Sequence, residues 1–544
     1  MKPSRVRVYI GSGVVALALS TSAVAASHCR PCHPDPFGTR LLTVPGTVGS
    51  YVVTRNTVRV DYDFSSACSA SVAWHPRTAN LHTYAAKACS RPVSSQILPW
   101  ATASRDSLTA VKGNHMVRVI VPAEATDRPA RLEVRARLTN RLLNSWPLPA
   151  VPVSLDVAGD IAVFSAAGGG GLYAVRLSDG RAGFVGVNRN GDTPQIERSG
   201  VVYADDIYRH SPNHSRASTL LKFVPIAGVR HAITVAGTPI ATPGRIRALA
   251  MDGPRVALAV ADAHGVCDQI RFWNIPWNFT SRLTQTSGPT CTGRHAAGGI
   301  TDVRIAGARA EWVTTYGGAS TVLAASIIRC QEWVLARPEA GAGGDQLAGL
   351  AGNGRILSFA IARHERELRG LASVTALRPR SESRTQTVVS GRFVPRALTA
   401  DGSRIAVLRD DGVVEIDRLD GTAEQRIVVG DVRAIALRAN RLVALTDRVL
   451  YVFDAKTGEL LRGWRAPAGV DPRVDVHSGV AVLTSRHVIY ALALETGRVA
   501  ALARSADPLV GAEIEAPGIA YAYNRNGGGH ARFIRFADIE AALR

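Results

Sequence analysis

Short apolar runs, each followed by a glycine turn, recur along this chain. Four of these segments align with one another without a gap, at residues 172–181, 413–422, 450–459 and 489–498. The last three begin 37 and 39 residues apart. A period near 40 residues with a strand and a turn in each unit is typical of a β-propeller, in which four-stranded sheets surround an axis.

The same pattern divides most of the chain into strand-rich units. We predict nine of them, at residues 153–187, 195–233, 246–285, 300–336, 347–389, 395–429, 432–466, 474–504 and 509–544. The fold class is therefore all-β, a β-propeller of about seven to nine four-stranded blades, with eight as the best single estimate and one unit miscounted or outside the ring. The last unit lacks an outer strand, so we expect the N-terminal part of the chain to supply one and close the ring. Residues 537–544 fit a short helix.

The chain before these units also has a strand-like pattern. Residues 57–64 and 131–138 alternate between apolar and polar side chains. We predict that residues 27–150 form an N-terminal β-rich segment, which is either a small β domain or one or two further blades. A proline-rich stretch at 147–152 marks its boundary with the propeller, predicted at residues 151–544.

The first 26 residues have the pattern of a secretory signal peptide. Three basic residues precede an apolar run at residues 8–18, and Ala23-Val24-Ala25 has the form of a cleavage site. Apart from this segment, the chain has no run near the ~20 apolar residues that a spanning helix needs. We therefore expect a secreted or cell-envelope protein without a membrane span after cleavage.

The chain is strongly basic, with a formal net charge of +20. Its 64 basic residues are almost all arginines, and they are spread along the sequence instead of being grouped in runs. This distribution fits the composition bias of a high-GC genome better than a nucleic-acid-binding stripe. We predict no specific nucleic-acid partner.

Seven cysteines remain after the signal segment, and in an exported protein they are candidates for disulfide bonds. Closing a short loop costs the least entropy, which favours pairs that are close in sequence. The predicted pairs are Cys29–Cys32, Cys68–Cys89 and Cys267–Cys291, with Cys330 left free.

Cys29-Arg-Pro-Cys32-His33 has the form C-x-x-C-H, the attachment pattern of c-type haem. The two thiols would bond to the haem and His33 would be the axial ligand. The next residues are Pro34-Asp-Pro36 and then strands, whereas a cytochrome c encloses its haem in helices. A tight disulfide is the alternative interpretation, and no other cofactor is predicted.

Other polar groups in the sequence fit loops or turns better than sites. His210 and His214 are separated by Pro212, which argues against two metal ligands on one helix face. The acidic pairs 205–206 and 410–411 could supply two carboxylates for acid-base chemistry, but their distance in space does not follow from the sequence. Asp410-Asp411-Gly412 and the Asn-Gly segment at 188–192 fit hairpin turns. The sequence therefore gives no catalytic residue and no metal ligand.

Leu450 to Trp464 resembles the blade motif of quinoprotein-like propellers, in which an aspartate, a Thr-Gly turn and a later tryptophan recur. Residues 399–419 and 489–499 resemble WD40-like or TolB-like repeats. The chain thus resembles a secreted bacterial β-propeller with PQQ-like repeats over residues 153–544. Quinoprotein dehydrogenases would imply a bound quinone, a calcium ion and adjacent cysteines, and this sequence has no adjacent cysteines. Trp464 is the one tryptophan that the sequence places in the motif.

Together these features predict an exported, non-enzymatic binding or scaffold module with an unknown protein or glycan partner. The alternatives are an extracytoplasmic hydrolase or quinone-dependent oxidoreductase, and an electron-transfer protein with haem at Cys29 and Cys32. We expect Tyr173, Tyr451 and Tyr490 to pack between blades, because they occupy the same position in the aligned segments. Any site should lie where the units differ, in the loops at 205–217 and 276–298.

Overall fold

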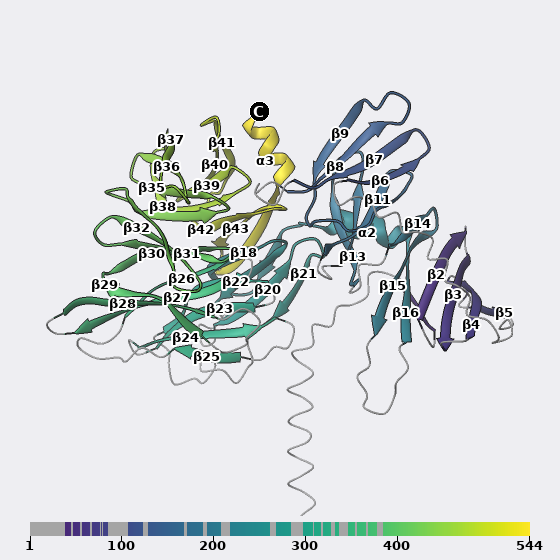
Figure 1. Cartoon of the computed structure of the whole chain (residues 1–544), viewed down its shortest axis with the longest axis horizontal. Coiled ribbons are helices and arrows are strands. Elements are labelled where there is room, and N and C mark those ends of the chain that lie inside the picture. Colours follow the sequence, from purple (N-terminus) through teal and green to yellow (C-terminus); the bar gives the residue numbers. More distant parts are fainter. Residues whose placement is uncertain are drawn as a thin grey trace, which may run out of the picture.

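The structure is a computed structural model, and nearly all of its regular structure is β-strand (Figure 1). It describes residues 39–544 with gaps at 45–46, 55–56, 66–67, 77, 79, 85–106, 123–128, 168–170, 189–192, 208–217, 262–267, 284–297, 308, 317–318, 328–331, 337–345, 354–355, 366–367 and 378–384. Within these ranges the sheets number eleven, and each has four antiparallel strands.

Four sheets form an N-terminal group, made of β2–β5, β6–β9, β10–β13 and β14–β16 with β1. The strands are β1 (Arg40–Val44), β2 (Thr47–Thr54), β3 (Thr57–Ser65), β4 (Cys68–His75), β5 (Asn80–Tyr84), β6 (Ser107–Lys112), β7 (His115–Ile120), β8 (Arg131–Ala136), β9 (Leu142–Pro147), β10 (Asp156–Ala158), β11 (Ile161–Ser165), β12 (Leu172–Arg176), β13 (Ala182–Gly186), β14 (Gln195–Glu197), β15 (Gly200–Ile207) and β16 (Ser218–Pro225). Helix α2 (Ile226–Val235) comes next in the chain and packs on β13.

Seven further sheets hold the rest of the described chain. Their strands are β17 (Ile240–Thr242), β18 (Ile246–Asp252), β19 (Arg255–Val260), β20 (Gln269–Asn274), β21 (Phe279–Arg282), β22 (Gly298–Ala306), β23 (Arg309–Tyr316), β24 (Ala319–Ser326), β25 (Glu332–Ala336), β26 (Gln346–Asn353), β27 (Ile356–Glu365), β28 (Leu368–Leu377), β29 (Thr385–Arg392), β30 (Pro395–Asp401), β31 (Arg404–Arg409), β32 (Val413–Arg418), β33 (Ala423–Val428), β34 (Ala434–Arg438), β35 (Arg441–Leu445), β36 (Val449–Asp454), β37 (Leu460–Arg465), β38 (Val470–His477), β39 (Val480–Ser485), β40 (Val488–Ala493), β41 (Val499–Arg504), β42 (Leu509–Glu515), β43 (Gly518–Arg525) and β44 (Gly528–Arg535). Helix α3 (Phe536–Leu543) ends the chain, as the sequence predicts.

These seven sheets form a closed ring, a β-propeller. The inner strands β18, β22, β26, β30, β34, β38 and β42 contact one another in that order, and β42 contacts β18. The last sheet takes its outer strand from β17, where Ile240 pairs with Ala531. The sequence predicts closure by a strand from the N-terminal part of the chain. The strand that closes the ring, β17, instead lies directly before the first inner strand, β18. The seven blades lie within the predicted seven to nine and are one fewer than the best single estimate.

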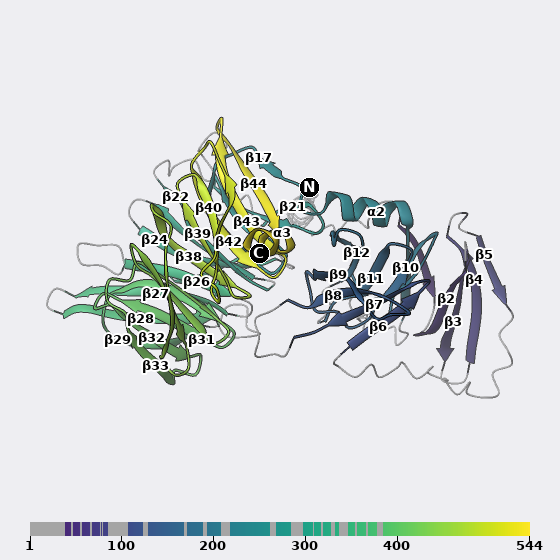
Figure 2. The same cartoon turned by 90° about the horizontal axis from the view of Figure 1, so that it is seen from above.

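The N-terminal group lies beside the ring (Figures 1 and 2). Its sheets contact one another in the order β2–β5, β14–β16, β10–β13, β6–β9. Strand β1 completes the β14–β16 sheet, where Leu42 pairs with Leu221. The first two predicted units, residues 153–187 and 195–233, therefore pack with this group, while the ring takes in residues 240–535. The predicted division of the chain near residue 150 stays a prediction.

Apolar side chains fill the spaces between neighbouring sheets, and the repeat tyrosines lie there. Tyr173 is buried between the β6–β9 and β10–β13 sheets, where it stacks on Phe164. Tyr451 and Tyr490 pack at the corresponding boundaries of the ring. Tyr451 and Tyr490 therefore pack between blades as predicted, whereas Tyr173 packs between two sheets of the N-terminal group.

The aligned segments end in turns that need glycine. Gly180, Gly421, Gly458 and Gly497 have φ between 67° and 84°, the left-handed region that L-residues with a Cβ rarely adopt. The repeated glycine is thus explained by turn geometry.

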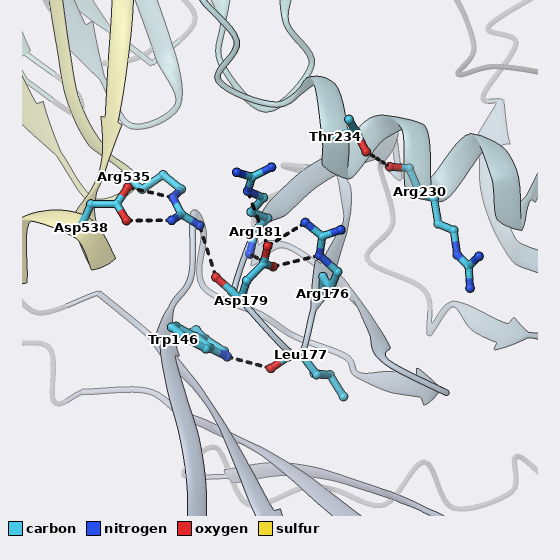
Figure 3. A network of polar contacts seen from close by, with 9 residues as sticks. All are labelled: Trp146, Arg176, Leu177, Asp179, Arg181, Arg230, Thr234, Arg535 and Asp538. Carbon is cyan, nitrogen blue, oxygen red and sulfur yellow. Dashed lines mark hydrogen bonds and ion pairs between the residues drawn. The ribbon is translucent and has the colours of Figure 1, made fainter. Parts of the chain in front are cut away.

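Polar and aromatic contacts join the two groups of sheets, and Figure 3 shows the polar contact between Arg535 and Asp179. Arg535, which pairs with Asp538, donates to the carbonyl oxygen of Asp179 at 3.2 Å. On another side of the junction, Trp277 packs on Phe184 with ring centroids 4.2 Å apart. An ion pair between Arg131 of β8 and Glu540 of α3 adds a third contact. The described part of the loop at 276–298, predicted to be a site, therefore contacts the N-terminal group.

Candidate functional site at the axis of the ring

The axis of the ring has two ends that differ in chemistry. Each inner strand begins after the loop from the previous blade and ends at a tight turn into its own second strand. We call the end with these tight turns the closed end and the end where the inner strands begin the rim end. Polar side chains occur at both ends, and their surroundings decide what each end can do.

At the closed end, acidic side chains connect one inner strand to the next. Asp475 of β38 accepts the N–H of Ile514 in β42 at 2.8 Å. Asp401 ends β30, and it accepts the N–H of Ala439 at 2.6 Å. Ala439 directly follows β34, the next inner strand of the ring. Glu513 in turn accepts the N–H of Met251 at 2.6 Å. Buried backbone groups must be paired, so these carboxylates have a structural task.

Two arginines link strands that are not neighbours in the ring. Arg304 of β22 reaches Glu513 of β42 at 3.1 Å, across the position of β18. Arg438 of β34 holds Glu515 of β42 with two hydrogen bonds of 2.9 and 3.1 Å, across the position of β38. Both pairs end on β42, which is the last inner strand in chain order. This strand is therefore held by strands on both of its sides. The closed end is thus occupied by ion pairs.

Burial shifts the protonation of these groups. It raises the pKa of Glu513 to about 8 against the effect of Arg304, and the Asp475 carboxylate adds to the rise. It also raises the pKa of Glu515 well above its ordinary value, although Arg438 opposes this. Burial and the charge of Arg438 lower the pKa of His477 well below its usual range, so this ring stays neutral beside Glu515.

Glu311 of β23 extends this cluster into the blade. Its carboxyl group is fully buried, and neither of its oxygens forms a hydrogen bond with the described residues. Burial and the nearby Asp302 carboxylate raise its pKa well above the ordinary value. The raised pKa favours the neutral form of Glu311, which costs less to bury than the charged form.

The closed end offers little for catalysis. General acid-base chemistry needs a carboxyl or imidazole within reach of a substrate. Here Asp401, Asp475, Glu513 and Glu515 accept backbone N–H groups or pair with arginine, and Glu311, His477 and Glu515 are buried. Among the residues that the structure describes, no group of three His, Cys, Asp or Glu side chains is placed to hold a metal ion.

The rim end carries exposed arginines instead. Arg247 and Arg396 are the extra residues of β-bulges near the start of β18 and β30. Arg473 lies in the irregular stretch of β38, and Arg433 directly precedes β34. All four side chains are exposed. A bulge adds an unpaired residue and re-aims its side chain. Together with Arg433, these residues place an exposed cation at or next to the start of four of the seven inner strands.

Two of these arginines are held in place across the neighbouring strand. Arg473 donates to the carbonyl oxygen of Val510 in β42 at 2.6 Å. Arg247 lies 3.4 Å from the buried carboxylate of Asp268, which also accepts the N–H of Ile300 in β22. The positions of Arg473 and Arg247 at the rim end are therefore set by contacts within the ring.

More positive charge surrounds these four residues, which we call the rim arginines. Further exposed arginines on the loops of the same end are Arg245, Arg392, Arg448, Arg465, Arg486, Arg504 and Arg525. The exposed acids described at this end are Asp410, Asp411, Asp431 and Asp447. The rim end thus has an excess of positive charge that a negatively charged partner would meet first.

The N-terminal group has a hollow of about 900 Å³. It lies beside the β6–β7, β10–β11 and β14–β15 turns and next to α2. Buried Ile161 and Leu177 form part of its wall, and the charged groups around it, such as Arg198 and Arg230, are exposed. The polar groups of this hollow do not form a cluster comparable to either end of the ring.

The cysteine and haem predictions fall mostly outside the described residues. Cys29, Cys32, His33, Cys89, Cys267 and Cys291 lie there, as does Cys330. Cys68 begins β4, but its side chain is not described. The three disulfides and the haem site stay predictions.

The other candidates from the sequence are not brought together. His210 and His214 lie outside the described residues. Asp205 and Asp206 lie within strand β15. Asp410 and Asp411 are exposed residues of the turn between β31 and β32, where Asp410 accepts the N–H of Val394 at 2.9 Å. They act as turn residues, as the sequence predicts.

The rim arginines were missed by sequence reasoning. They are four of many arginines in a basic chain, and each lies next to an ordinary strand start. The available signal was an arginine at the start of an inner strand in several units. Reading it requires knowing which strand of each unit faces the axis.

Comparison with known proteins finds only weak structural similarities. No known family model matches the sequence, and no curated protein matches it. The solved structures that resemble it include Sqt1 from Saccharomyces cerevisiae, at 8% identity and a TM-score of 0.36, covering 54% of this chain and 97% of that one. A chain of the mitotic checkpoint complex is 15% identical with a TM-score of 0.39, covering 56% and 92%. KlHsv2 is 10% identical with a TM-score of 0.37, covering 52% and 89%. Similarities this weak carry no argument about function.

The helices in the described part of the chain are short. Neither α2 nor α3 is long and apolar enough to cross a membrane.

Proposed function

We propose that this protein is an exported, non-enzymatic binding module, and that its ring binds a partner at the rim end of the axis. The observation that carries the proposal is the contrast between the two ends. The buried acids that the inner strands carry at the closed end pair with arginine or with the backbone, as Glu515 does with Arg438. At the rim end, arginines such as Arg396 are exposed around the mouth of the axis.

Export rests on the N-terminal segment of the sequence, with its basic start, apolar run and Ala23-Val24-Ala25 site. Seven cysteines in the chain after it fit an oxidising compartment. The non-enzymatic role is supported by the acids of the closed end. Asp475 and Glu513 each accept a backbone N–H of the neighbouring inner strand, which gives both acids a structural role in the ring.

Site-specific photo-crosslinking tests the proposal in cells that make the full chain. A photoreactive amino acid would replace Arg396 at the rim end, and Ser403, an exposed turn residue, would be replaced as the control at the closed end. We expect discrete adducts from position 396 and none of the same mass from position 403. Equal patterns at both positions, or no adduct at either, would contradict binding at the rim.

A further inference from the structure

We infer that the partner at the rim is a protein segment with spaced carboxylates, an acidic peptide held by Arg247, Arg396, Arg433 and Arg473. This inference rests on the proposed binding function and names the chemistry of its partner. It follows from the kind of cation at the rim, from the way these cations are spaced, and from the acids that lie among them.

Arginine is suited to carboxylates in particular. Its planar guanidinium offers several N–H donors in a fork that matches the two oxygens of a carboxylate. The rim arginines belong to β18, β30, β34 and β38, so no two share a strand. Cations distributed around a mouth in this way suit charges spaced along a flexible chain.

The acids of the rim argue against a dense polyanion. Arg433 pairs with Asp447, and Arg247 lies beside Asp268. Asp410 and Asp411 are exposed at the same end. A nucleic acid or a heavily sulfated glycan would bring closely spaced negative charge against these carboxylates, at a repulsive cost. A peptide can place its carboxylates at the arginines and uncharged residues beside the aspartates.

The four arginines are not equivalent in the free protein. Arg473 already donates to a backbone carbonyl, and Arg247 already pairs with a buried carboxylate. Neutralising these two would disturb the ring itself. Arg396 is exposed, and the ion-pair partner of Arg433, Asp447, is exposed too, so these two can be changed without uncovering a buried charge.

The test measures the binding of a labelled short peptide, in which glutamates are separated by Gly-Ser spacers, to the full mature protein by fluorescence anisotropy. Matched probes are the same peptide with each glutamate replaced by glutamine, inorganic polyphosphate and a sulfated oligosaccharide. We expect the glutamate peptide to bind, the glutamine peptide not to bind, and binding to weaken as salt is raised. Tighter binding of polyphosphate or the sulfated sugar than of the glutamate peptide would overturn the peptide assignment.

Variants locate the site. Arg396→Gln and Arg433→Gln should each weaken peptide binding about two- to fivefold, as expected for exposed ion pairs, and the double variant should weaken it further. Arg396→Lys keeps the charge and should retain most of the affinity. Arg418→Gln is the matched control, because Arg418 is an exposed arginine at the closed end. Equal loss in Arg418→Gln and Arg396→Gln would overturn the inference.

The two proposals fail in different ways. Adducts from position 396 without binding of the glutamate peptide would show that the partner is not acidic, and binding at the rim would stand. Absence of both would remove the proposed function as well.

Discussion

The indole N–H of Trp464 donates to the carbonyl oxygen of Leu494 at 2.9 Å, and so fastens one blade to the next. Trp464 lies on the outer strand β37, and Leu494 opens the turn that contains Gly497 in the following blade. The indole ring lies over Gly497, where a Cβ would overlap its atoms. The glycine at position 497 therefore leaves room for the Trp464 ring of the preceding blade.

The same contact recurs in the N-terminal group and, in changed form, in the ring. Trp146 donates to the carbonyl oxygen of Leu177 at 3.0 Å and lies over Gly180. Gln386, near the start of the outer strand β29, donates to the carbonyl oxygen of Leu419 in the next blade at 2.7 Å. The contact therefore joins neighbouring sheets on both sides of the junction.

Gly497→Ala should destabilise the protein more than the same change at a glycine without neighbours. The new Cβ meets both an unfavourable φ of 71° and the Trp464 ring. Gly469 has a φ of 70°, and a Cβ added there would have no atom within 4 Å, so Gly469→Ala carries the backbone strain alone. We expect roughly 1 kcal/mol for Gly469→Ala and at least twice that for Gly497→Ala, by chemical denaturation. Equal losses would mean that the Trp464 contact is unimportant.

Trp464→Phe should cost about 1 kcal/mol of unfolding free energy, because an aromatic ring remains and the hydrogen bond to Leu494 is lost. Trp146→Phe should have a similar effect, since its contact with Leu177 has the same form. Hydrogen exchange should increase in the turn at 494–497 for the first variant and not for the second. No change in exchange at that turn would contradict the assigned contact.

Asp475→Ala should be more damaging than an exposed substitution. It removes acceptors for the N–H groups of Val476 and Ile514, and the latter bond joins two blades. Leaving these groups unpaired should cost about 2 to 4 kcal/mol. Asp447→Ala is the control, because the Asp447 side chain is 71% exposed, and its loss should stay below about 1 kcal/mol. Thermal and denaturant unfolding of both variants would measure the difference.

Stability should fall as the pH rises from about 6.5 to 8. The pKa of Glu513 is raised to about 8 by burial, so the folded state holds a proton that the unfolded state has already released. This contribution is complete below the unfolded pKa and is lost as the pH passes through 8. His477, whose pKa is lowered, acts in the other direction, and its effect is confined to pH below about 6.5.

Glu513→Gln should flatten this part of the profile, because glutamine cannot lose a proton. Glu495→Gln is the control, since the Glu495 side chain is 60% exposed. The measurement is the free energy of unfolding at several pH values between about 6.5 and 8. A slope that is unchanged in Glu513→Gln would assign the pH dependence to other groups.

Trp277→Ala should loosen the junction between the two groups of sheets. It removes the ring that packs on Phe184, next to the hydrogen bond from the N–H of Phe184 to the carbonyl oxygen of Pro276. We expect faster hydrogen exchange at Phe184 and a larger radius of gyration in small-angle scattering. Trp333→Ala, in the outer strand β25 of the ring, should leave both unchanged.

The sequence by itself determined the repeat and its turns. Each four-stranded sheet is encoded locally, because strand alternation and a glycine at positive φ depend on neighbouring residues. The nine predicted units therefore correspond to sheets of the structure. Closure of the ring by an added strand could be predicted because the last unit lacks an outer strand. The C-terminal helix could be predicted from residues 537–544.

Only the tertiary structure decided which units share a ring. The blades that contain Tyr173 and Tyr490 have nearly the same local pattern, yet one packs in the N-terminal group and the other in the ring. That choice depends on contacts between sheets, as with Trp146, whose partner Leu177 lies 31 residues away. The grouping of arginines at the rim end was hidden for the same reason. Arg396 looks like any other arginine until closure of the ring places it near Arg433 and Arg473 around one axis.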